Sequence, residues 1–193
     1  VPHLAFLDLS IVFYVLVDVS EEGTAAMVVN RSHADTWKGQ AETLWEDAVK
    51  NVKNLLPAEF VTMNHALKSL LGDVEYEEGD LLLEKKKDYD QMYVLSNKFR
   101  NYGAACIAYP NVLEMIGQIL KKDYYILPSS VHEVIIVPYS EIYVCSKLDE
   151  MVREINSTQV EEEDVLSNHV YLYDRVSGKL RVGSSVQTGR MMA

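Results

Sequence analysis

The N-terminal third of the chain alternates apolar and polar segments in a way that predicts two strands and then a helical turn. Residues Leu9–Val17 form a continuously apolar run, which is typical of a β-strand covered on both faces. A turn over Ser20–Gly23 separates this run from a second predicted strand, Thr24–Asn30. Residues Ser32–Trp37 then predict one short helical turn.

Two longer helices are predicted next along the chain. The first ends before Pro57, because the residue that precedes a proline disfavours helical backbone angles. The second covers Glu59–Leu71. The first helix carries its apolar side chains at the i, i+4 and i+8 spacing of an amphipathic helix, at Leu44, Trp45, Ala48, Val49, Val52, Leu55 and Leu56.

After a highly charged stretch, an order of strand, strand and helix recurs twice. A helix is expected from Pro110, because the first helical position has no need of an amide proton, with Leu113, Ile116, Ile119 and Leu120 facing inward. The predicted strands are Met92–Asn97, Gly103–Tyr109, Tyr124–Pro128 and Glu133–Pro138, and His169–Arg175 and Lys179–Val182 close the pattern as a hairpin.

A second helix in this half is expected from Ser146. Ser146 and Asp149 have the spacing of a capping box, in which each side chain caps a backbone amide of the other residue. The buried stripe of this helix is predicted at Leu148, Met151, Val152 and Ile155.

These elements predict an α+β fold with a mostly antiparallel sheet, built from successive strand–strand–helix units with the helices packed on the sheet. Residues 1–71 form a predicted N-terminal lobe and residues 91–185 a C-terminal α+β lobe, together one compact domain. Residues 72–90 are dense in charge and predict an exposed loop between the lobes. Residues 186–193 form a tail without a pattern.

The charge of the chain narrows the classes of partner. There are 18 Lys and Arg against 29 Asp and Glu, which gives a formal net charge of −11. Binding to nucleic acid depends on cations that neutralise phosphates, and anionic membrane surfaces attract cations in the same way. No apolar run approaches the ~20 residues that span a bilayer. We therefore expect neither a nucleic acid nor a membrane as partner.

Cys106 and Cys145 lie far apart in the chain, without a CxxC spacing. We expect both to be reduced, buried and apolar in character, which favours a reducing compartment and hence the cytoplasm. The sequence shows no signal peptide, and it opens on Val1 rather than methionine. We therefore expect that the natural N-terminus lies further upstream.

The stretch "LPSSVHE" holds the residue types of a hydrolase between two predicted strands: Ser129, Ser130, His132 and Glu133. Side chains two residues apart on a strand are separated by roughly 6–7 Å. A histidine that activates a hydroxyl must lie within ~2.6–3.2 Å of it. The stretch is thus better explained as a turn, and these residues remain weak catalytic candidates.

The histidines of the chain do not form a metal-binding motif. The five histidines are scattered singly, and "HEV" lacks the second histidine of the zinc motif H-E-x-x-H. We expect no metal and no cofactor, although His132 and His169 both begin predicted strands and would meet at one sheet edge.

Tyrosines suit protein interfaces because they combine a large ring with a polar hydroxyl. Tyr171 and Tyr173 are therefore candidates for binding a partner. The alternative is that these tyrosines only line the rim of an ordinary sheet.

Four segments carry a resemblance to a known family: "VPHLAFLDLSIVFYVLV", "MYVLSNKFRNYGAACIAYP", "YYILPSSVHEVIIVP" and "MVREINSTQVEEEDVLSNHVYLYD". They resemble domain-of-unknown-function family 5688, a bacterial family found largely in Gram-positive gut anaerobes. The resemblance implies no established activity. It implies a shared polar site among the residues inside these segments, namely Ser129, Ser130, His132, Glu133, Asn156, Asn168 and His169.

Three functional hypotheses follow. The first is a non-enzymatic cytoplasmic accessory domain that acts through contacts with a protein partner or a second copy. The second is a hydrolase or metal-dependent enzyme that uses the LPSSVHE turn and the segment Ser167–His169. The third is an acidic module that captures basic partners electrostatically, with binding that weakens as salt increases.

Overall fold

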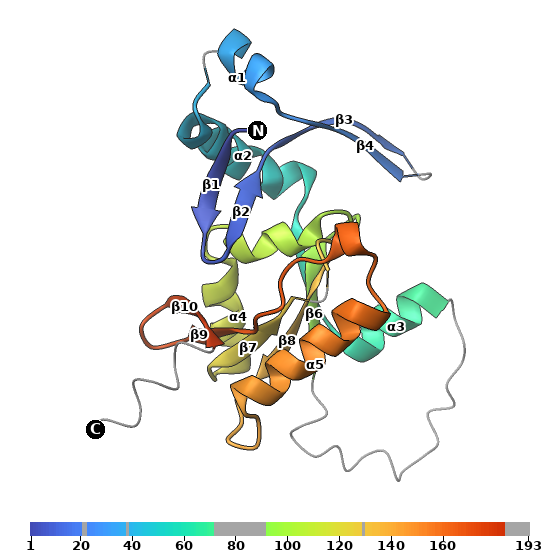
Figure 1. The fold of residues 1–193 in the computed structure, drawn as a ribbon, viewed down its shortest axis with the longest axis vertical. Coiled ribbons are helices and arrows are strands. Elements are labelled where there is room, and N and C mark those ends of the chain that lie inside the picture. The colour runs from blue at the N-terminus through green and yellow to red at the C-terminus, as the bar shows by residue number, and fades with distance from the viewer. Residues whose placement is uncertain (21–22, 38, 72–91, 129, 184–193) are drawn as a thin grey trace.

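Six antiparallel strands form the central sheet of the protein, in the order β10–β9–β7–β8–β6–β5 (Figure 1). The computed structural model describes residues 1–20, 23–37, 39–71, 92–128 and 130–183. The expected α+β fold with a mostly antiparallel sheet is confirmed. The strands are β5 (Ala58–Thr62), β6 (Tyr93–Asn97), β7 (Tyr124–Leu127), β8 (Val134–Pro138), β9 (Tyr171–Asp174) and β10 (Lys179–Val182).

Side chains on the central strands alternate between two cores. On β7, Tyr124 and Ile126 join one buried cluster, while Tyr125 and Leu127 join the other. This division follows from the two-residue period of a β-strand. All four residues of β7 are buried, so apolar side chains cover both faces at the centre of the sheet.

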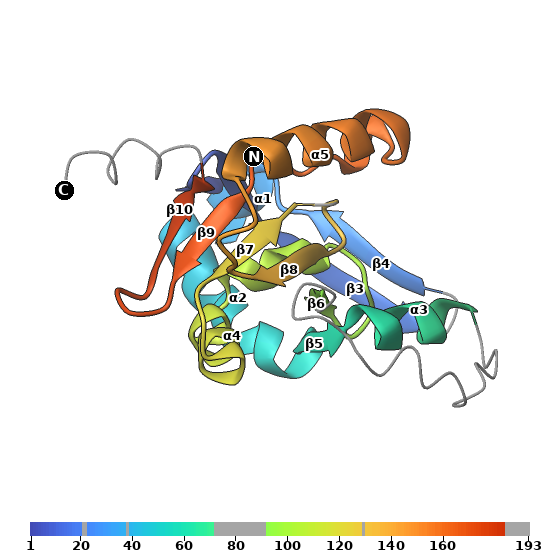
Figure 2. The same ribbon diagram turned by 90° about the horizontal axis from the view of Figure 1, so that it is seen from below.

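Helices cover each face of this sheet. One face packs against the 3₁₀ helix η2 (Gly103–Ala108) and helix α4 (Val112–Leu120). The other face packs against helix α5 (Cys145–Thr158), which lies across the sheet in Figure 2. A short 3₁₀ helix, η3 (Glu162–Asp164), leads from α5 towards β9.

The residues before the central sheet form a separate layer, which we call the N-terminal layer and which occupies the top of Figure 1. It consists of two antiparallel hairpins and two helices. Phe6 and Leu9 of the first hairpin pack against the core of the central sheet. The elements are β1 (His3–Phe6), β2 (Leu9–Val12), β3 (Tyr14–Ser20), β4 (Gly23–Val28), α1 (Arg31–Trp37) and α2 (Ala41–Leu55).

The predicted single strand Leu9–Val17 is wrong. The chain forms a hairpin of β1 and β2, and β3 begins after Phe13. Phe13 is buried, whereas Val17 is 66% exposed. Every residue from Leu9 to Leu16 lines a groove, so the run is apolar without being covered by two layers.

The predicted helix Glu59–Leu71 is wrong in its first half. Residues Ala58–Thr62 form β5, which pairs with the buried strand β6, and only Met63–Leu71 form a helix, α3. The backbone hydrogen bonds of an available sheet edge here override the local helical pattern. The central sheet therefore takes strands from both predicted lobes, while the predicted loop over residues 72–90 and the tail over residues 186–193 lie outside the described residues.

The predicted strand Gly103–Tyr109 is also wrong, because residues Gly103–Ala108 form η2. The backbone amide of Ala104 donates to the carbonyl of Val131 at 3.1 Å. A Cβ atom on Gly103 would overlap the Ser96 hydroxyl and the carbonyl of His132. This close approach of η2 to β6 and to the β7–β8 turn fixes the path of the chain. The spacing of apolar residues in the sequence does not reveal it.

The helix that follows η2 begins later than predicted. Its first residue is Val112 rather than Pro110, and Asn111 is the cap residue. Ile116 is buried as expected, but Ile119 is exposed.

The capping box predicted at Ser146 is wrong as well. Helix α5 begins at Cys145, and the cap residue Val144 has no side-chain cap. The carboxylate of Asp149 is buried and accepts the backbone amide of Val170 at 2.7 Å. Asp149 thus ties α5 to the chain entering β9. The outer residue of the predicted stripe, Ile155, is exposed.

The remaining predicted elements are confirmed to within a few residues: the strands β4, β6, β7 and β8, the final hairpin of β9 and β10, and the helices α1 and α2. Both cysteines are free and buried, as expected. Within the described ranges, no helix combines the length and the apolar character needed to cross a bilayer.

Candidate functional site

A groove with a volume of about 700 Å³ lies between the N-terminal layer and η2. This volume is within the ~300–1,000 Å³ of typical ligand sites. The apolar stripe predicted on α2 lines the groove, which explains why none of its residues is fully buried. Leu55 was wrongly included in this stripe, because its side chain is 50% exposed and does not line the groove. We call it the interlayer groove; the side chains that line it include Leu9, Phe13, Leu44, Trp45, Val52 and Ile107.

The charged residues of the interlayer groove are all acidic. Asp47, Glu163 and Asp164 line it, and no Lys or Arg is among the described residues that do so. Lys50 pairs with Asp47 at 3.2 Å, but both side chains are largely exposed, and such surface pairs contribute little. The groove therefore combines an apolar floor with negative charge at its edge.

Two tyrosines, a histidine and an aspartate form a connected group beside the groove, which we call the rim cluster: Tyr14, Tyr102, His132 and Asp164. The rings of Tyr14 and Tyr102 stack with centroids 4.8 Å apart. The ring of His132 lies 5.5 Å from that of Tyr102. Burial, together with the neighbouring Tyr102, raises the pKa of Tyr14. The rim cluster thus joins β3, the loop before η2, the β7–β8 turn and η3.

The hydrogen bonds of His132 define its tautomer. The backbone amide of Tyr102 donates to Nδ1 at 3.2 Å, so Nδ1 carries no proton. The proton of the neutral ring then lies on Nε2, which is 3.3 Å from Oδ1 of Asp164. Both ring nitrogens are engaged, and the imidazole is held in one orientation.

The loop after β6 positions Tyr102. The buried side chain of Asn97 accepts the backbone amide of Phe99 at 3.0 Å and donates to the carbonyl of Asn101 at 2.7 Å. Arg100 and Tyr102 both have φ of 51°, a left-handed conformation that is uncommon outside glycine. Such conformations persist where the surrounding structure imposes them and cluster at functional sites.

The predicted turn between β7 and β8 is confirmed, since the two strands are antiparallel neighbours. The hydroxyl of Ser130 accepts the backbone amide of His132 at 3.1 Å, and the backbone amide of Ser130 contacts the carbonyl of Glu133 at 3.3 Å. The Ser130 hydroxyl therefore stabilises the turn, while the imidazole of His132 contacts Tyr102 and Asp164. Ser129 lies outside the described residues. This arrangement does not support a serine–histidine pair.

A second polar group joins the N-terminal layer to the central sheet. Asp8, in the turn between β1 and β2, accepts the hydroxyls of Ser167 at 2.7 Å and Tyr171 at 2.8 Å. Tyr171 is fully buried, and burial raises the pKa of its hydroxyl far above the ordinary value. We call Asp8, Ser167 and Tyr171 the interlayer clamp.

The remaining polar candidates lie next to the interlayer clamp. The side-chain amide of Asn156 donates to the carbonyl of Ser167 at 2.9 Å and to Oδ1 of Asn168 at 3.0 Å. The backbone amide of His169 donates to the Ser167 hydroxyl at 3.0 Å. The structure therefore brings Asn156 and Asn168 into contact, and Ser167 links them to the clamp that contains Tyr171. These contacts hold α5 to the segment that precedes β9.

The strand tyrosines do not form a surface. Tyr171 and Tyr173 are buried, and Tyr173 stacks on Tyr124 at 5.0 Å. The tyrosines that reach the surface at the groove are Tyr14, which is 39% exposed, and Tyr102, which is 41% exposed. The sequence carries no signal for this pair, because they meet only through the packing of β3 against the loop before η2.

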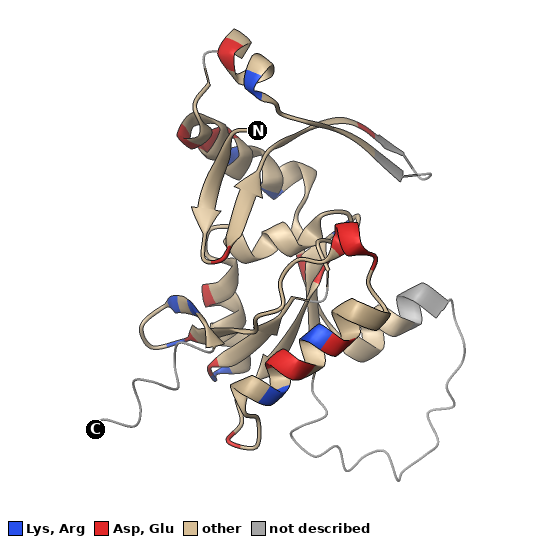
Figure 3. Ribbon diagram, in the orientation of Figure 1, with Lys and Arg blue, Asp and Glu red and all other residues tan. Residues whose placement is uncertain are grey.

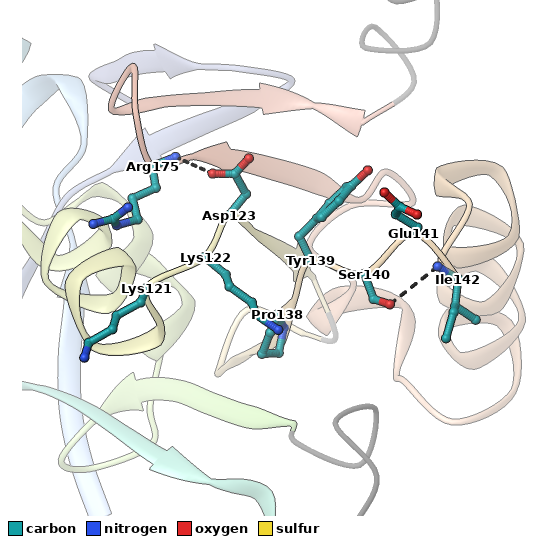
Figure 4. Close-up of a pocket in the computed structure, with 9 residues that line it drawn as sticks. All are labelled: Lys121, Lys122, Asp123, Pro138, Tyr139, Ser140, Glu141, Ile142 and Arg175. Carbon is teal, nitrogen blue, oxygen red and sulfur yellow. Dashed lines mark hydrogen bonds between the residues drawn. The ribbon is translucent and has the colours of Figure 1, made fainter.

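A second hollow, of about 600 Å³, lies beside the ends of β8 and α4 (Figure 4). It holds three basic residues, Lys121, Lys122 and Arg175. Figure 4 shows the chain of Lys122 running towards Pro138, while Lys121 extends away from the other labelled residues. The carboxylate of Asp123 accepts the backbone amide of Arg175 at 2.9 Å. The cations do not converge on a common point, so the hollow offers no defined anion site.

Metal binding has no geometric basis in the described part of the chain. Among those residues, no three His, Cys, Asp or Glu side chains lie close enough to hold an ion.

Fold and site together define an α+β domain with a groove between two layers. The chain belongs to the family of unknown function DUF5688, which it matches over residues 1–175. The resemblance noted in the sequence is thereby confirmed. No curated protein and no solved structure matches the chain significantly.

Proposed function

We propose that this protein is a non-enzymatic binding domain whose interlayer groove takes an amphipathic, basic segment of a protein partner. The observation that carries this proposal is the composition of the groove, which has an apolar floor and acidic residues at its edge. Apolar pockets with a few polar groups are the usual form of a binding site.

The geometry favours a helical segment over an extended strand. An amphipathic helix places apolar side chains at i, i+3, i+4 and i+7 into a hydrophobic groove. The floor of the interlayer groove is the apolar stripe of α2, which has the same period and runs along that helix. Two amphipathic helices would then bury their apolar stripes against each other.

The charges favour a basic partner. Glu163 and Asp164 are neighbours on η3 and both line the groove, and Asp164 also belongs to the rim cluster. The net charge of −11 attracts a cationic segment over longer distances and raises its association rate. The exposed rings of Tyr14 and Tyr102 add a surface on which a Lys or Arg side chain packs favourably.

A designed peptide tests this function directly. We expect the protein to bind a fluorescent amphipathic helix of leucine and lysine, measured by anisotropy, and to bind a matched helix of leucine and glutamate much more weakly. Added salt should weaken the first interaction, because it screens the exposed charges. Equal binding of both peptides would contradict the proposal.

A variant that fills the groove tests the location. Ala48 lies on the groove stripe of α2, and Ala48→Trp should reduce affinity for the lysine peptide by about tenfold or more, which corresponds to about 1.4 kcal/mol. Thr43→Trp places the same ring on the exposed side of α2 and should change little. Equal effects of the two substitutions would place the binding site elsewhere.

Two neighbouring glutamates test the charge. Glu163→Lys reverses a charge in the groove, whereas Glu162→Lys makes the same change of net charge at an exposed position outside it. We expect the first substitution to weaken binding of the lysine peptide more than the second. If both weaken it equally, the attraction is a property of the whole chain and not of the groove.

The cellular setting belongs to the same proposal. An accessory domain that recruits a partner in the cytoplasm agrees with two free, buried cysteines. Fractionation of cells that produce the full-length protein, followed by immunoblotting, would test the location.

A further inference from the structure

The hairpin of β3 and β4 extends to one side from the N-terminal layer (Figure 1). Neither strand pairs with a third strand among the described residues. An isolated two-stranded hairpin is marginally stable in water. We call this hairpin the arm.

The arm exposes apolar side chains on both of its faces. Val15 lies opposite Met27, and Tyr14 lies opposite Val28. These pairs alternate between the two faces because of the two-residue period of a strand, and all four side chains are exposed. Exposed apolar surfaces of this kind mark interaction sites.

The two edges of the arm differ. On β3 the register shifts between Leu16 and Asp18, which is the signature of a bulge. Bulges and charged residues protect a strand edge from pairing with another chain. Strand β4 has the sequence GTAAMV, and each of its residues from Gly23 to Val28 has a partner on β3, so it carries no bulged residue. It also contains no charged residue and no proline. Figure 3 shows no charged residue along the described part of β4.

We propose that the free edge of β4 pairs with β4 of a second copy of this chain, which would join the two arms in a four-stranded antiparallel sheet. A strand that pairs antiparallel with itself is related to its partner by a two-fold axis. Closed two-fold dimers are by far the commonest oligomers.

The absence of charged residues on β4 fits a second copy better than a basic partner. Two chains of net charge −11 repel each other, so their contact needs a segment without charge, and β4 is such a segment. A basic partner is attracted instead by the acidic edge of the interlayer groove. Tyr14, Val15, Leu16 and Ala26 of the arm also line the interlayer groove. The proposed dimer uses the backbone edge of β4, however, and so it does not require the peptide binding proposed for the groove.

Light scattering after size exclusion tests this assignment. We expect the protein to be a dimer that dissociates on dilution. Met27→Lys places like charges on the paired strands and should raise the dissociation constant by about tenfold or more. Val17→Lys makes the same kind of change on the bulged strand β3, where the side chain is 66% exposed, and should leave the dimer intact.

Disulfide trapping tests the two-fold axis without weakening the arm. Single cysteines would replace Ala25, Ala26 and Met27 on β4, with Val17→Cys on β3 as the control. We expect oxidation to cross-link the copies most efficiently at the β4 position nearest the axis, and not at residue 17. A monomer at every concentration, an equal effect of the two lysine variants, or cross-linking only through Val17→Cys would each overturn the proposal. The Ala48→Trp variant of the groove should remain dimeric.

Discussion

The central sheet and the N-terminal layer are both built from antiparallel strands, but they differ in packing. Tyr124, Ile126 and Ile136 of the sheet are completely buried. In the described part of residues 1–56, the buried apolar side chains are Phe13, Val29 and Ala34. Backbone pairing and half-buried contacts hold the N-terminal layer in place, whereas side chains on both faces hold the sheet.

This difference teaches where binding surfaces arise in the molecule. A region with few buried contacts opens locally at a lower free energy than a packed core. The interlayer groove and the arm both belong to the N-terminal layer, while the sheet supplies a rigid support through the interlayer clamp. The following substitutions test this division, beginning with the largest expected effect.

Ile136→Ala should destabilise the protein by about 2–5 kcal/mol, because it leaves a cavity at the centre of the sheet. Val17→Ala in the arm should change the free energy of unfolding by less than about 0.5 kcal/mol. Urea denaturation measures both values. Ile142→Ala, at an exposed position beside the sheet, is the control, and a cost comparable to that of Ile136→Ala would contradict the comparison.

High pH should destabilise the folded protein, because a thiol on η2 is buried. Burial raises the pKa of the Cys106 thiol from 9.0 to about 12. The folded state therefore holds a proton that the unfolded state loses, so this contribution is fully present below pH 9 and is lost as pH rises towards about 12. The loss is at most about 4 kcal/mol.

Urea unfolding at a series of alkaline pH values tests this linkage. The free energy of unfolding of the Cys106→Ala variant should fall less steeply above pH 9 than that of the wild type. Buried Tyr124 and Tyr171, whose pKa values are also raised, should leave part of the slope in both proteins. Identical slopes would show that the thiol does not contribute.

Asp8→Ala should cost about 1–3 kcal/mol, because it removes the acceptor of the buried Tyr171 hydroxyl. In a double-mutant cycle with Tyr171→Phe, the two effects should not add, since both residues belong to one hydrogen bond. Asp18→Ala on the arm provides an exposed control. Additive effects would mean that the interlayer clamp does not couple the two layers.

Ser146→Ala should have the smallest effect, less than about 0.5 kcal/mol, because this serine is exposed and does not cap α5. Asp149→Ala, only three positions along the same helix, should cost about 1–3 kcal/mol because it leaves the buried amide of Val170 without its acceptor. Thermal unfolding of the two variants compares them. A large effect of Ser146→Ala would restore the predicted capping box.

The sequence located one member of the rim cluster and missed the rest. His132 was visible because it lies in a polar stretch between two apolar strands. Tyr14 was hidden in a run interpreted as buried, and Asp164 in an acidic segment. These residues meet through contacts between distant segments, such as that between Tyr102 and His132. A pattern that reports only neighbours along the chain contains no record of such contacts.

The interlayer groove was partly foreseen. The stripe predicted on α2 lines the groove, with the exception of Leu55, which is 50% exposed. Periodicity identifies the side of a helix that avoids water, but it does not tell whether a neighbouring layer fills that side. Here the neighbouring layer leaves a cavity of about 700 Å³.

The sequence by itself determined the α+β class, the alternating strands β7 and β8, the helix α2 and the buried state of both cysteines, because each depends on local periodicity or on residue type. Only the tertiary structure decided that Leu9–Val17 divides between two hairpins and that Ala58–Thr62 joins the edge of the sheet. It also decided that Gly103–Ala108 forms a 3₁₀ helix that lines the groove. In these segments, hydrogen bonds and close contacts with distant parts of the chain contribute more free energy than the local preference of the residues.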